Sequence, residues 1–383
     1  MVEKNEETSI AAMADSITNA SDAPPGPIQA MVVGTSDIVA EPVKAVLRRL
    51  SGVDLAAEAT DGVDAVSHLR RLAVDVIFID TGDPKVKLAT DLSRLLKVDG
   101  DAQIVLVATL TFVNVKNAMA GLVAGAAEFV QAPARHTPHV AEPEFTRQIA
   151  DLAQGLGRAR REKGVRVFAA PPAANRFEHP TPKELRQRRP HIPKAIAIAS
   201  STGGPQALFS LFTALSREVT QPIFLTQHMP PGFTTALADH ITRRTGWPCT
   251  EGKDGETVKN GQIYMAPGGF HMIPRQSAGG VTIKIDDGPE ESFCKPSAEP
   301  MMRGLIAAYG AENILFVVMT GMGSDGKVGA KAVADGGGTV IAQDKETSIV
   351  WGMPGAVAAA GDCHAVLPLG DLPKFITQAA AGK

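Results

Sequence analysis

Short apolar runs alternate with segments of helical spacing along most of this chain. In the first third, strands are predicted at residues 29–33, 55–59, 75–80, 103–107 and 128–131. Helical spacing lies between them, most clearly over residues 42–50 and 63–72. Strands separated in this way by helices predict an α/β fold with a parallel, doubly wound, flavodoxin-like sheet, which binds ligands at the carboxyl ends of its strands.

The second half of the chain repeats this alternation and adds an antiparallel element. Buried strands are predicted at 195–199, 221–227, 313–320 and 339–344, and helices at 206–215, 233–244, 299–309 and 327–335. The alternating residues 281–285 and the turn-containing segment 261–272 are typical of a β-hairpin region. We therefore expect a second, mostly parallel α/β domain that carries a hairpin.

Length and composition divide the chain further. With 383 residues and 44% hydrophobic residues, two domains and a connector are expected. Residues 1–27 are polar, end in prolines and predict a disordered tail. We expect a receiver-like domain over 28–140, a basic, proline-containing linker over 141–190 and a catalytic domain over 191–383. The linker is either a solvated spacer or a docking segment for an acidic partner.

The overall charge and the cysteines exclude several classes of protein. A formal net charge of −3 predicts no field that would attract nucleic acid. The three cysteines have no C-x-x-C spacing, so neither a disulfide framework nor a zinc site is indicated. The N-terminus is acidic and no apolar run approaches the ~18 residues of a membrane span. We expect a cytoplasmic protein without direct membrane insertion.

Three polar residues each follow a predicted buried strand of the second domain: Ser201, His228 and Asp325. Taken singly, each residue is typical of a helix cap or of a structural hydrogen bond. Because the carboxyl ends of parallel strands meet at one edge of a sheet, the three together favour a nucleophile, a base and an orienting acid for acyl transfer.

The same region allows a second interpretation. Residues 321–326 match G-x-G-x-x-G after a strand and before a helix, and Asp344 follows 18 residues after Gly326. This is a formal match to a dinucleotide-binding fingerprint. Against it, Asp325 would place a carboxylate beside the pyrophosphate, and Ser201 and His228 would have no role. A non-catalytic signalling scaffold is a further alternative.

Several motifs of the second domain resemble the chemotaxis protein-glutamate methylesterase (CheB) family and occur in the same order. They are residues 199–205, 227–230, 266–268, 287–289, 320–326, 342–343 and 352–354. The resemblance implies hydrolysis of glutamate γ-methyl esters on the cytoplasmic helices of methyl-accepting chemoreceptors, with glutamine deamidation as a second activity. This activity would reset receptor methylation during chemotactic adaptation.

The same resemblance implies roles for single residues. Ser201 would attack the ester, His228 would act as base and Asp325 would orient the imidazole. Thr202 would help to position the site, and the Met322 N–H would contribute to the oxyanion hole. The chain departs from the family at Ser200, Lys295 and Glu299. The extra hydroxyl at Ser200 leaves open which serine attacks, although the register with Thr-Gly-Gly favours Ser201.

The first domain resembles a response-regulator receiver in which Asp80 would accept a phosphoryl group. The positions of the family's acidic pair are Gly34 and Thr35, and its hydroxyl and lysine positions are Ala108 and Ala132. Without those groups, a Mg²⁺ ion and the phosphoryl oxygens lack their protein partners. We expect a pseudo-receiver without Mg²⁺, an enzyme without a cofactor and altered phosphorylation control. A chemotaxis histidine kinase is a possible partner.

Overall fold

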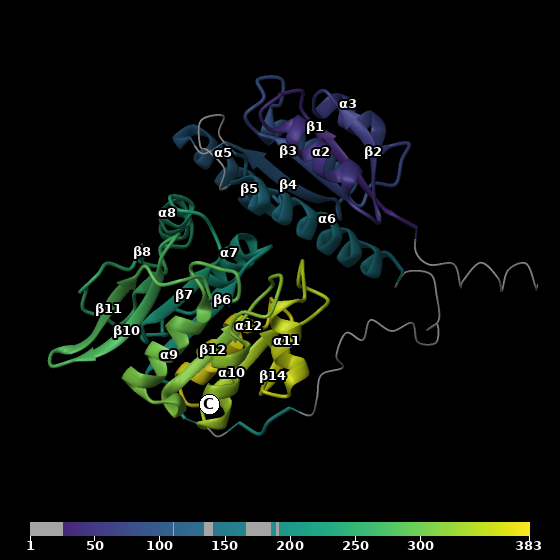
Figure 1. Ribbon diagram of the computed structural model, residues 1–383. Coiled ribbons are helices and arrows are strands. Elements are labelled where there is room, and N and C mark those ends of the chain that lie inside the picture. Colours follow the sequence, from purple (N-terminus) through teal and green to yellow (C-terminus); the bar gives the residue numbers. More distant parts are fainter. Residues whose placement is uncertain (1–25, 110, 134–140, 166–184, 189–190) are drawn as a thin grey trace, which may run out of the picture.

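The computed structural model describes residues 26–109, 111–133, 141–165, 185–188 and 191–383 (Figure 1). Residues 1–25 of the predicted tail (1–27) and residues 166–184 and 189–190 of the predicted linker (141–190) lie outside the described part of the chain. The described chain forms two α/β units, each built on a parallel sheet, together with one antiparallel hairpin. The predicted fold class is confirmed.

The N-terminal unit is a five-stranded parallel sheet in the order β2-β1-β3-β4-β5. Its strands are β1 (Ile28–Val33), β2 (Val53–Ala59), β3 (Val76–Asp80), β4 (Gln103–Ala108) and β5 (Glu128–Gln131). Its helices are α2 (Ala40–Arg49), α3 (Gly62–Leu69), α4 (Leu88–Val98), α5 (Phe112–Val123) and α6 (Ala141–Val165). Helices α2 and α6 cover one face and α3, α4 and α5 cover the other, as the continuous apolar strands require.

Helix α6 belongs to this unit, although the sequence predicted a linker from residue 141. Its apolar side chains Phe145, Ile149, Leu152 and Leu156 are buried against the sheet. Two ion pairs hold the helix to the rest of the unit: Arg161 with Asp75 at 2.6 Å, and Arg160 with Asp99. The receiver-like domain therefore extends to residue 165, and the predicted boundary at 140 lies too early.

The C-terminal unit has a seven-stranded parallel sheet in the order β14-β13-β12-β6-β7-β9-β8. Its strands are β6 (Ala195–Ser200), β7 (Ile223–Gln227), β8 (Cys249–Glu251), β9 (Ile263–Met265), β12 (Ile314–Val318), β13 (Thr339–Gln343) and β14 (Ala365–Leu367), beside the hairpin β10 (His271–Ser277) and β11 (Gly280–Asp286). Its α-helices are α7 (Gly204–Ala214), α8 (Phe233–Thr245), α9 (Ala298–Tyr309), α10 (Lys327–Asp335), α11 (Met353–Ala360) and α12 (Leu372–Ala380).

Alternate residues of each central strand face two different helical layers. Ile196 and Ile198 of β6 pack with α7, α8 and α12, whereas Ala197 and Ala199 pack with α9, α10 and α11. The central strands are therefore buried on both faces.

The receiver-like unit packs against the C-terminal unit through α5, β5 and α6 (Figure 1). The rings of Phe129 in β5 and Phe233 in α8 are stacked with centroids 4.2 Å apart. One apolar core continues from one unit into the other through this contact. The two units are thus closely packed against each other at the edge where the candidate site lies.

Candidate active site

Strands β12, β6 and β7 are neighbours at the centre of the C-terminal sheet. Ser201 follows β6, His228 follows β7, and Asp325 lies in the loop that follows β12. The strand order therefore places the three predicted residues at the carboxyl edge of adjacent strands, which is the usual position of an active site in an open α/β sheet.

His228 and Asp325 form a hydrogen-bonded pair, with His228 Nε2 2.8 Å from Asp325 Oδ2. Asp325 is 1% exposed and also accepts hydrogen bonds from the Ser297 hydroxyl (2.7 Å) and the Ala298 N–H (2.7 Å). Burial opposes the charge on Asp325, but His228 and these two donors outweigh it and lower the pKa of the carboxyl. For His228, burial opposes protonation, but Asp325 and Cys294 outweigh it and raise its pKa.

A carboxylate also occupies the start of α10. Glu299 accepts the N–H groups of Val328 (2.9 Å) and Gly329 (2.7 Å), which would otherwise be available to an anion. Asp344, the proposed ribose ligand of a dinucleotide site, accepts the N–H of Thr347 in its own loop at 2.9 Å. The dinucleotide interpretation is wrong because the helix terminus that would bind the pyrophosphate is already filled by Glu299.

The two neighbouring serines have different surroundings. Ser200 is fully buried, and its hydroxyl donates to Gln227 Oε1 at 2.7 Å. Gln227 in turn donates to the carbonyl of Ser201 at 3.0 Å, and the Ser201 N–H donates to Thr320 O at 3.0 Å. The backbone of Ser201 is therefore fixed on both sides, while its 9% exposed side chain lies in the loop.

The hydroxyl of Ser201 makes no hydrogen bond with His228 in the part of the chain that the structure describes. The second ring nitrogen, Nδ1, instead lies 3.4 Å from the sulfur of Cys294. The structure thus brings His228 and Asp325 together and places Ser201 on the adjacent strand end, without closing the contact between Ser201 and the imidazole.

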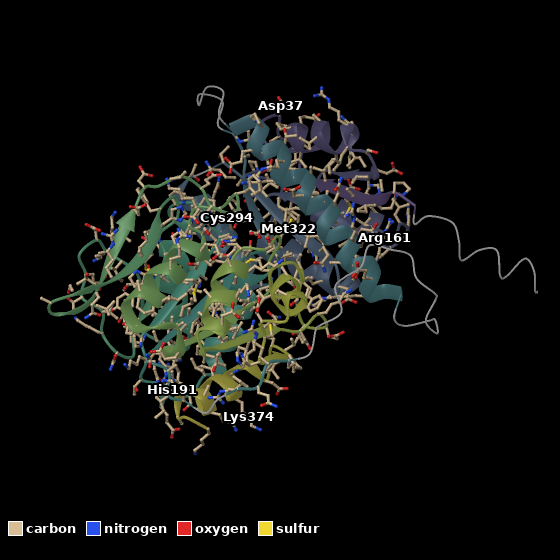
Figure 2. The ribbon with its side chains drawn as sticks, turned by 60° about the horizontal axis from the view of Figure 1, so that its bottom comes forward. Asp37, Arg161, His191, Cys294, Met322 and Lys374 are labelled. Carbon is tan, nitrogen blue, oxygen red and sulfur yellow. The ribbon has the colours of Figure 1, made fainter. Side chains whose placement is uncertain are left out.

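The two remaining predicted residues, Thr202 and Met322, lie where the two units meet. Thr202 is 3% exposed and contacts Glu128 of the receiver-like unit. Met322 packs its side chain close to Gly155 of α6 (Figure 2). Its N–H donates no backbone hydrogen bond within the described residues, as an oxyanion donor requires. Gly321 beside it has no room for a side chain, because a Cβ there would lie 2.8 Å from Ser201 Cβ.

The receiver-like unit contacts the loop that carries Ser201. The Gly203 N–H donates to Ala127 O at 3.0 Å, and the side-chain amide of Gln206 donates to Ala126 O. Burial raises the pKa of Glu128 to about 7, against hydrogen bonds from the Phe129 N–H and Thr202 and against the charge of His228. A carboxyl group of one unit therefore lies beside the candidate catalytic residues of the other.

Comparison with known proteins shows the family of this chain. The family model described as CheB methylesterase matches residues 196–376. The protein-glutamate methylesterase/protein-glutamine glutaminase of Azospirillum brasilense is 40% identical over 93% of each chain. The chain belongs to the CheB methylesterase family. A protein of the same description from Paramagnetospirillum magneticum is 38% identical, covering 92% of this chain and 96% of the relative.

A solved structure is similar to part of this chain. The catalytic domain of Thermotoga maritima CheB methylesterase is 38% identical, with a TM-score of 0.47, and covers 49% of this chain and 98% of that domain. Membership of the CheB methylesterase family makes the chain an enzyme of the hydrolase class. Within the described residues, no helix is long and apolar enough to cross a membrane.

In the receiver-like unit, Asp80 lies at the carboxyl end of β3 and is 2% exposed. Asp80 accepts hydrogen bonds from the Ser36 hydroxyl and from the Gly82 N–H (2.9 Å). Burial raises the pKa of Asp80, although those two hydrogen bonds act in the opposite direction.

A Cβ at Gly34 would lie 2.7 Å from Asp80 Cβ, so this position cannot hold a carboxylate unless the backbone or Asp80 shifts. The residues present therefore do not fit a receiver Mg²⁺ site, and no described group of three His, Cys, Asp or Glu could hold a metal ion.

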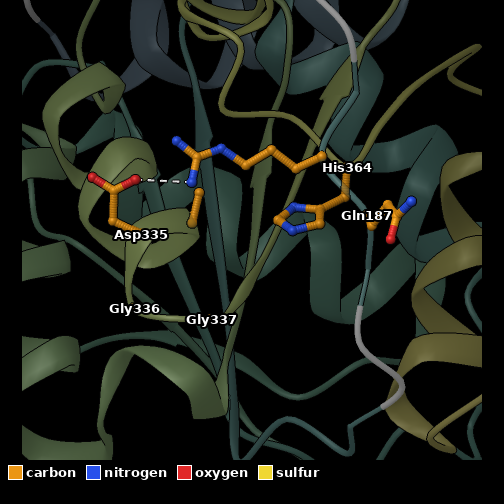
Figure 3. A pocket seen from close by; sticks show the side chains of 7 residues that line it. Gln187, Asp335, Gly336, Gly337 and His364 are labelled. Atoms are coloured by element: carbon orange, nitrogen blue, oxygen red, sulfur yellow. Dashed lines mark ion pairs between the residues drawn. The ribbon is translucent and has the colours of Figure 1, made fainter.

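A polar pocket lies at the opposite edge of the C-terminal sheet, where α10 ends and β14 begins (Figure 3). Its lining includes Arg186, Asp335 and His364. Arg186 is bound by Asp335 at 2.8 Å and by Asp362 at 2.6 Å, so its charge is already neutralised. This pocket is remote from Ser201, His228 and Asp325.

Sequence reasoning did not assign a role to Glu128, Cys294 or Ser297, all of which contact the predicted residues. The only available signal was the resemblance around Lys295-Pro-Ser297, which marks the segment without showing that Ser297 binds Asp325. Glu128 and Cys294 come close to the site through contacts between distant parts of the chain, and no local pattern indicates such contacts.

Proposed function

We propose that residues 191–383 hydrolyse glutamate γ-methyl esters on the cytoplasmic helices of methyl-accepting chemoreceptors and release methanol, resetting receptor methylation in chemotaxis. The names of the relatives support this substrate class. The observation that carries the mechanism is the His228–Asp325 pair on the strand end adjacent to Ser201.

Ser201 Oγ attacks the ester carbonyl, and His228 takes its proton through Nδ1, since Asp325 binds Nε2. The N–H of Met322 stabilises the oxyanion, and Thr202 helps to position the loop. The intermediate then expels methoxide, which leaves as methanol with the proton from His228. Water then attacks the acyl-enzyme as His228 takes one of its protons, and His228 returns that proton to Ser201 Oγ as the free glutamate leaves. The same route with a glutamine substrate releases ammonia.

Ser201 is the preferred nucleophile because the Ser200 hydroxyl is fully buried and bonded to Gln227. The reaction needs no metal ion or cofactor, because each of its proton transfers is assigned to a side chain of this unit. The non-catalytic scaffold becomes the weaker alternative, because a scaffold would not need a buried acid held by three hydrogen bonds beside an imidazole.

The test is methanol release from methylated receptor fragments by the full chain and by Ser201→Ala, with Ser200→Ala as the matched control. We expect Ser201→Ala to lose activity at least 10³-fold with an unchanged melting temperature, because the nucleophile is lost and the fold is not. Ser200→Ala should keep turnover within about tenfold. Full activity of Ser201→Ala would refute the assignment of the nucleophile.

We also propose that the receiver-like unit restrains the esterase through the contacts of Ala126, Ala127 and Glu128 with the Ser201 loop. Its control by phosphorylation is altered or lost, because Gly34, Thr35, Ala108 and Ala132 cannot supply the usual partners of Mg²⁺ and phosphate. A chemotaxis histidine kinase or another protein would then act on this unit by binding rather than by phosphoryl transfer to Asp80.

A further inference from the structure

Both ring nitrogens of His228 have partners, and neither partner is Ser201. Nε2 lies 2.8 Å from Asp325 Oδ2, and Nδ1 lies 3.4 Å from Cys294 Sγ. Because Asp325 is a carboxylate, it can only accept a hydrogen bond, so Nε2 carries the proton. The neutral imidazole therefore accepts protons only at Nδ1, the nitrogen that faces the thiol.

The imidazole cannot exchange the roles of its two nitrogens. Asp325 is fixed by Ser297 and by the N–H of Ala298 at the start of α9, each at 2.7 Å. Ser201 must therefore reach Nδ1, and it competes there with Cys294. Nδ1 of a neutral imidazole accepts a hydrogen bond from the S–H group, and Nδ1 of a charged imidazole donates its N–H to the sulfur, so the thiol can bind His228 in either state.

The loop that carries Cys294 is held in place on both sides. Cys294 N donates to Glu291 O at 3.0 Å and Glu291 N donates to Cys294 O at 3.2 Å, while Arg303 binds the Glu291 carboxylate at 2.5 Å. Between them, Ser292 and Phe293 have φ values of 54° and 61°, which residues with a side chain rarely adopt. A tight, braced turn of this kind fixes the direction of the thiol.

The turn also contacts the receiver-like unit. The ring of Phe293, which is 79% exposed, lies 5.6 Å from the guanidinium of Arg147 on α6. Figure 2 shows Cys294 and Met322 in the region where the C-terminal unit faces α6. The segment that holds the thiol against His228 is thus itself in contact with the receiver-like unit.

We propose that Cys294 is a positioning residue that holds Nδ1 of His228 in the resting enzyme and must release it before Ser201 can be deprotonated. This inference rests on the proposed function, in which Ser201 is the nucleophile. The thiol acts through His228 and does not itself react with the ester.

The chain offers a chemical probe of this arrangement. Of the three cysteines, Cys249 and Cys363 are buried and only Cys294 is partly exposed. Burial raises the pKa of the thiols of Cys249 and Cys363, which makes them poor nucleophiles. Iodoacetamide should therefore alkylate Cys294: a carbon–sulfur bond forms, the carbon–iodine bond breaks, iodide leaves, and the thiol proton passes to His228 or to solvent.

The experiment compares methanol release by the full chain with that of Cys294→Ala, Cys294→Ser and Ser201→Ala. We expect Cys294→Ala to raise kcat/KM by about 2–10-fold, because a weak hydrogen bond to the base is removed. Cys294→Ser keeps a donor beside the imidazole and should return the rate towards the starting value. Alkylation of the unchanged chain should abolish turnover, while Cys294→Ala should resist the reagent.

The pH profile distinguishes a positioning role from a merely structural one. The titratable groups that face His228 are Asp325, Cys294 and Glu128. Without Cys294, the imidazolium loses one partner, so the acid limb of kcat/KM should move to lower pH. A Cys294→Ala enzyme with an unchanged or lower rate and an unmoved acid limb overturns the inference. If Ser201→Ala stays active, the proposed nucleophile fails; if it is inactive while Cys294→Ala behaves as the unchanged chain, only the inference about the thiol fails.

Discussion

Glu128 allows the contact between the two units to be tested through its protonation. Burial raises the pKa of this carboxyl from 4.5 to about 7. The difference of about 2.5 between these two pKa values corresponds to about 3.4 kcal/mol of free energy. The side chain keeps part of its surface accessible to water, which screens the charge, so we expect a measured effect of about 1–3 kcal/mol.

The sign follows from the raised pKa. Below pH 4.5 the carboxyl is protonated in both the folded and the unfolded chain, and its contribution to stability is fully present. Between pH 4.5 and about 7 the folded chain holds a proton that the unfolded chain has lost, so stability falls as the pH rises. Glu128→Gln removes this dependence while keeping the size of the side chain and a hydrogen-bonding group beside Thr202.

The assay is urea unfolding at pH 5 and pH 8, followed by the fluorescence of Trp247 and Trp351, which both lie in the C-terminal unit. We expect the stability of Glu128→Gln, relative to the unchanged chain, to increase by about 1–3 kcal/mol between the two pH values. Glu144→Gln, at an exposed position on α6, is the matched control and should show no such change. A difference that stays constant within about 0.5 kcal/mol would refute the reasoning.

Two further predictions concern the receiver-like unit. Phe129→Ala removes the ring that stacks on Phe233, so it should weaken the packing of the receiver-like unit on the C-terminal unit and raise methanol release several-fold. An unchanged rate, with the fold checked by circular dichroism, would mean that the receiver-like unit does not restrain the esterase. Acetyl phosphate with Mg²⁺ should leave methanol release unchanged, in the full chain and in Asp80→Ala alike, because Gly34 supplies no carboxylate for the ion and the Ser36 hydroxyl already binds Asp80; a rise that Asp80→Ala abolishes would contradict this.

The central strands could be predicted from the sequence because they are continuous apolar runs buried on both faces. The predicted strand at 128–131 and the predicted helix at 327–335 coincide with β5 and α10. Helices α11 and α12 were not predicted. In α11 most residues are small and apolar, so no polar face marks a helical period.

Helix α6 shows why charge alone is a poor guide to domain boundaries. Its buried residues recur with helical spacing, but basic residues and the prolines that follow make the segment resemble a linker. Arg160 and Arg161 are basic residues of this helix that bind Asp99 and Asp75 of the receiver-like unit. Part of the apparent linker charge therefore stabilises the packing of α6 on its own domain.

Only those residues of the candidate site that follow a buried strand could be predicted from the sequence. Ser201, His228 and Asp325 could be found because each follows a buried strand, and the order of the strands makes those ends neighbours. Cys294 and Glu128 could not be found in this way, because Cys294 meets His228 across 66 residues and Glu128 belongs to the other unit. Such contacts depend on the packing of a loop and of a domain, which no local pattern encodes.

The orientation of the candidate acid also depends on helix termini. Asp325 accepts the N–H of Ala298 in the first turn of α9, and Glu299 of that same turn accepts the N–H groups of Val328 and Gly329 at the start of α10. Glu299 of α9 thus caps α10, and Asp325, in the loop before α10, caps α9. Because both caps lie within a few residues of Asp325, a change that weakens either cap should also displace the carboxylate that binds His228. The stability of the C-terminal unit and the orientation of the imidazole are therefore coupled. We expect Glu299→Ala to lower the stability of the unit and to disturb the position of His228 at the same time.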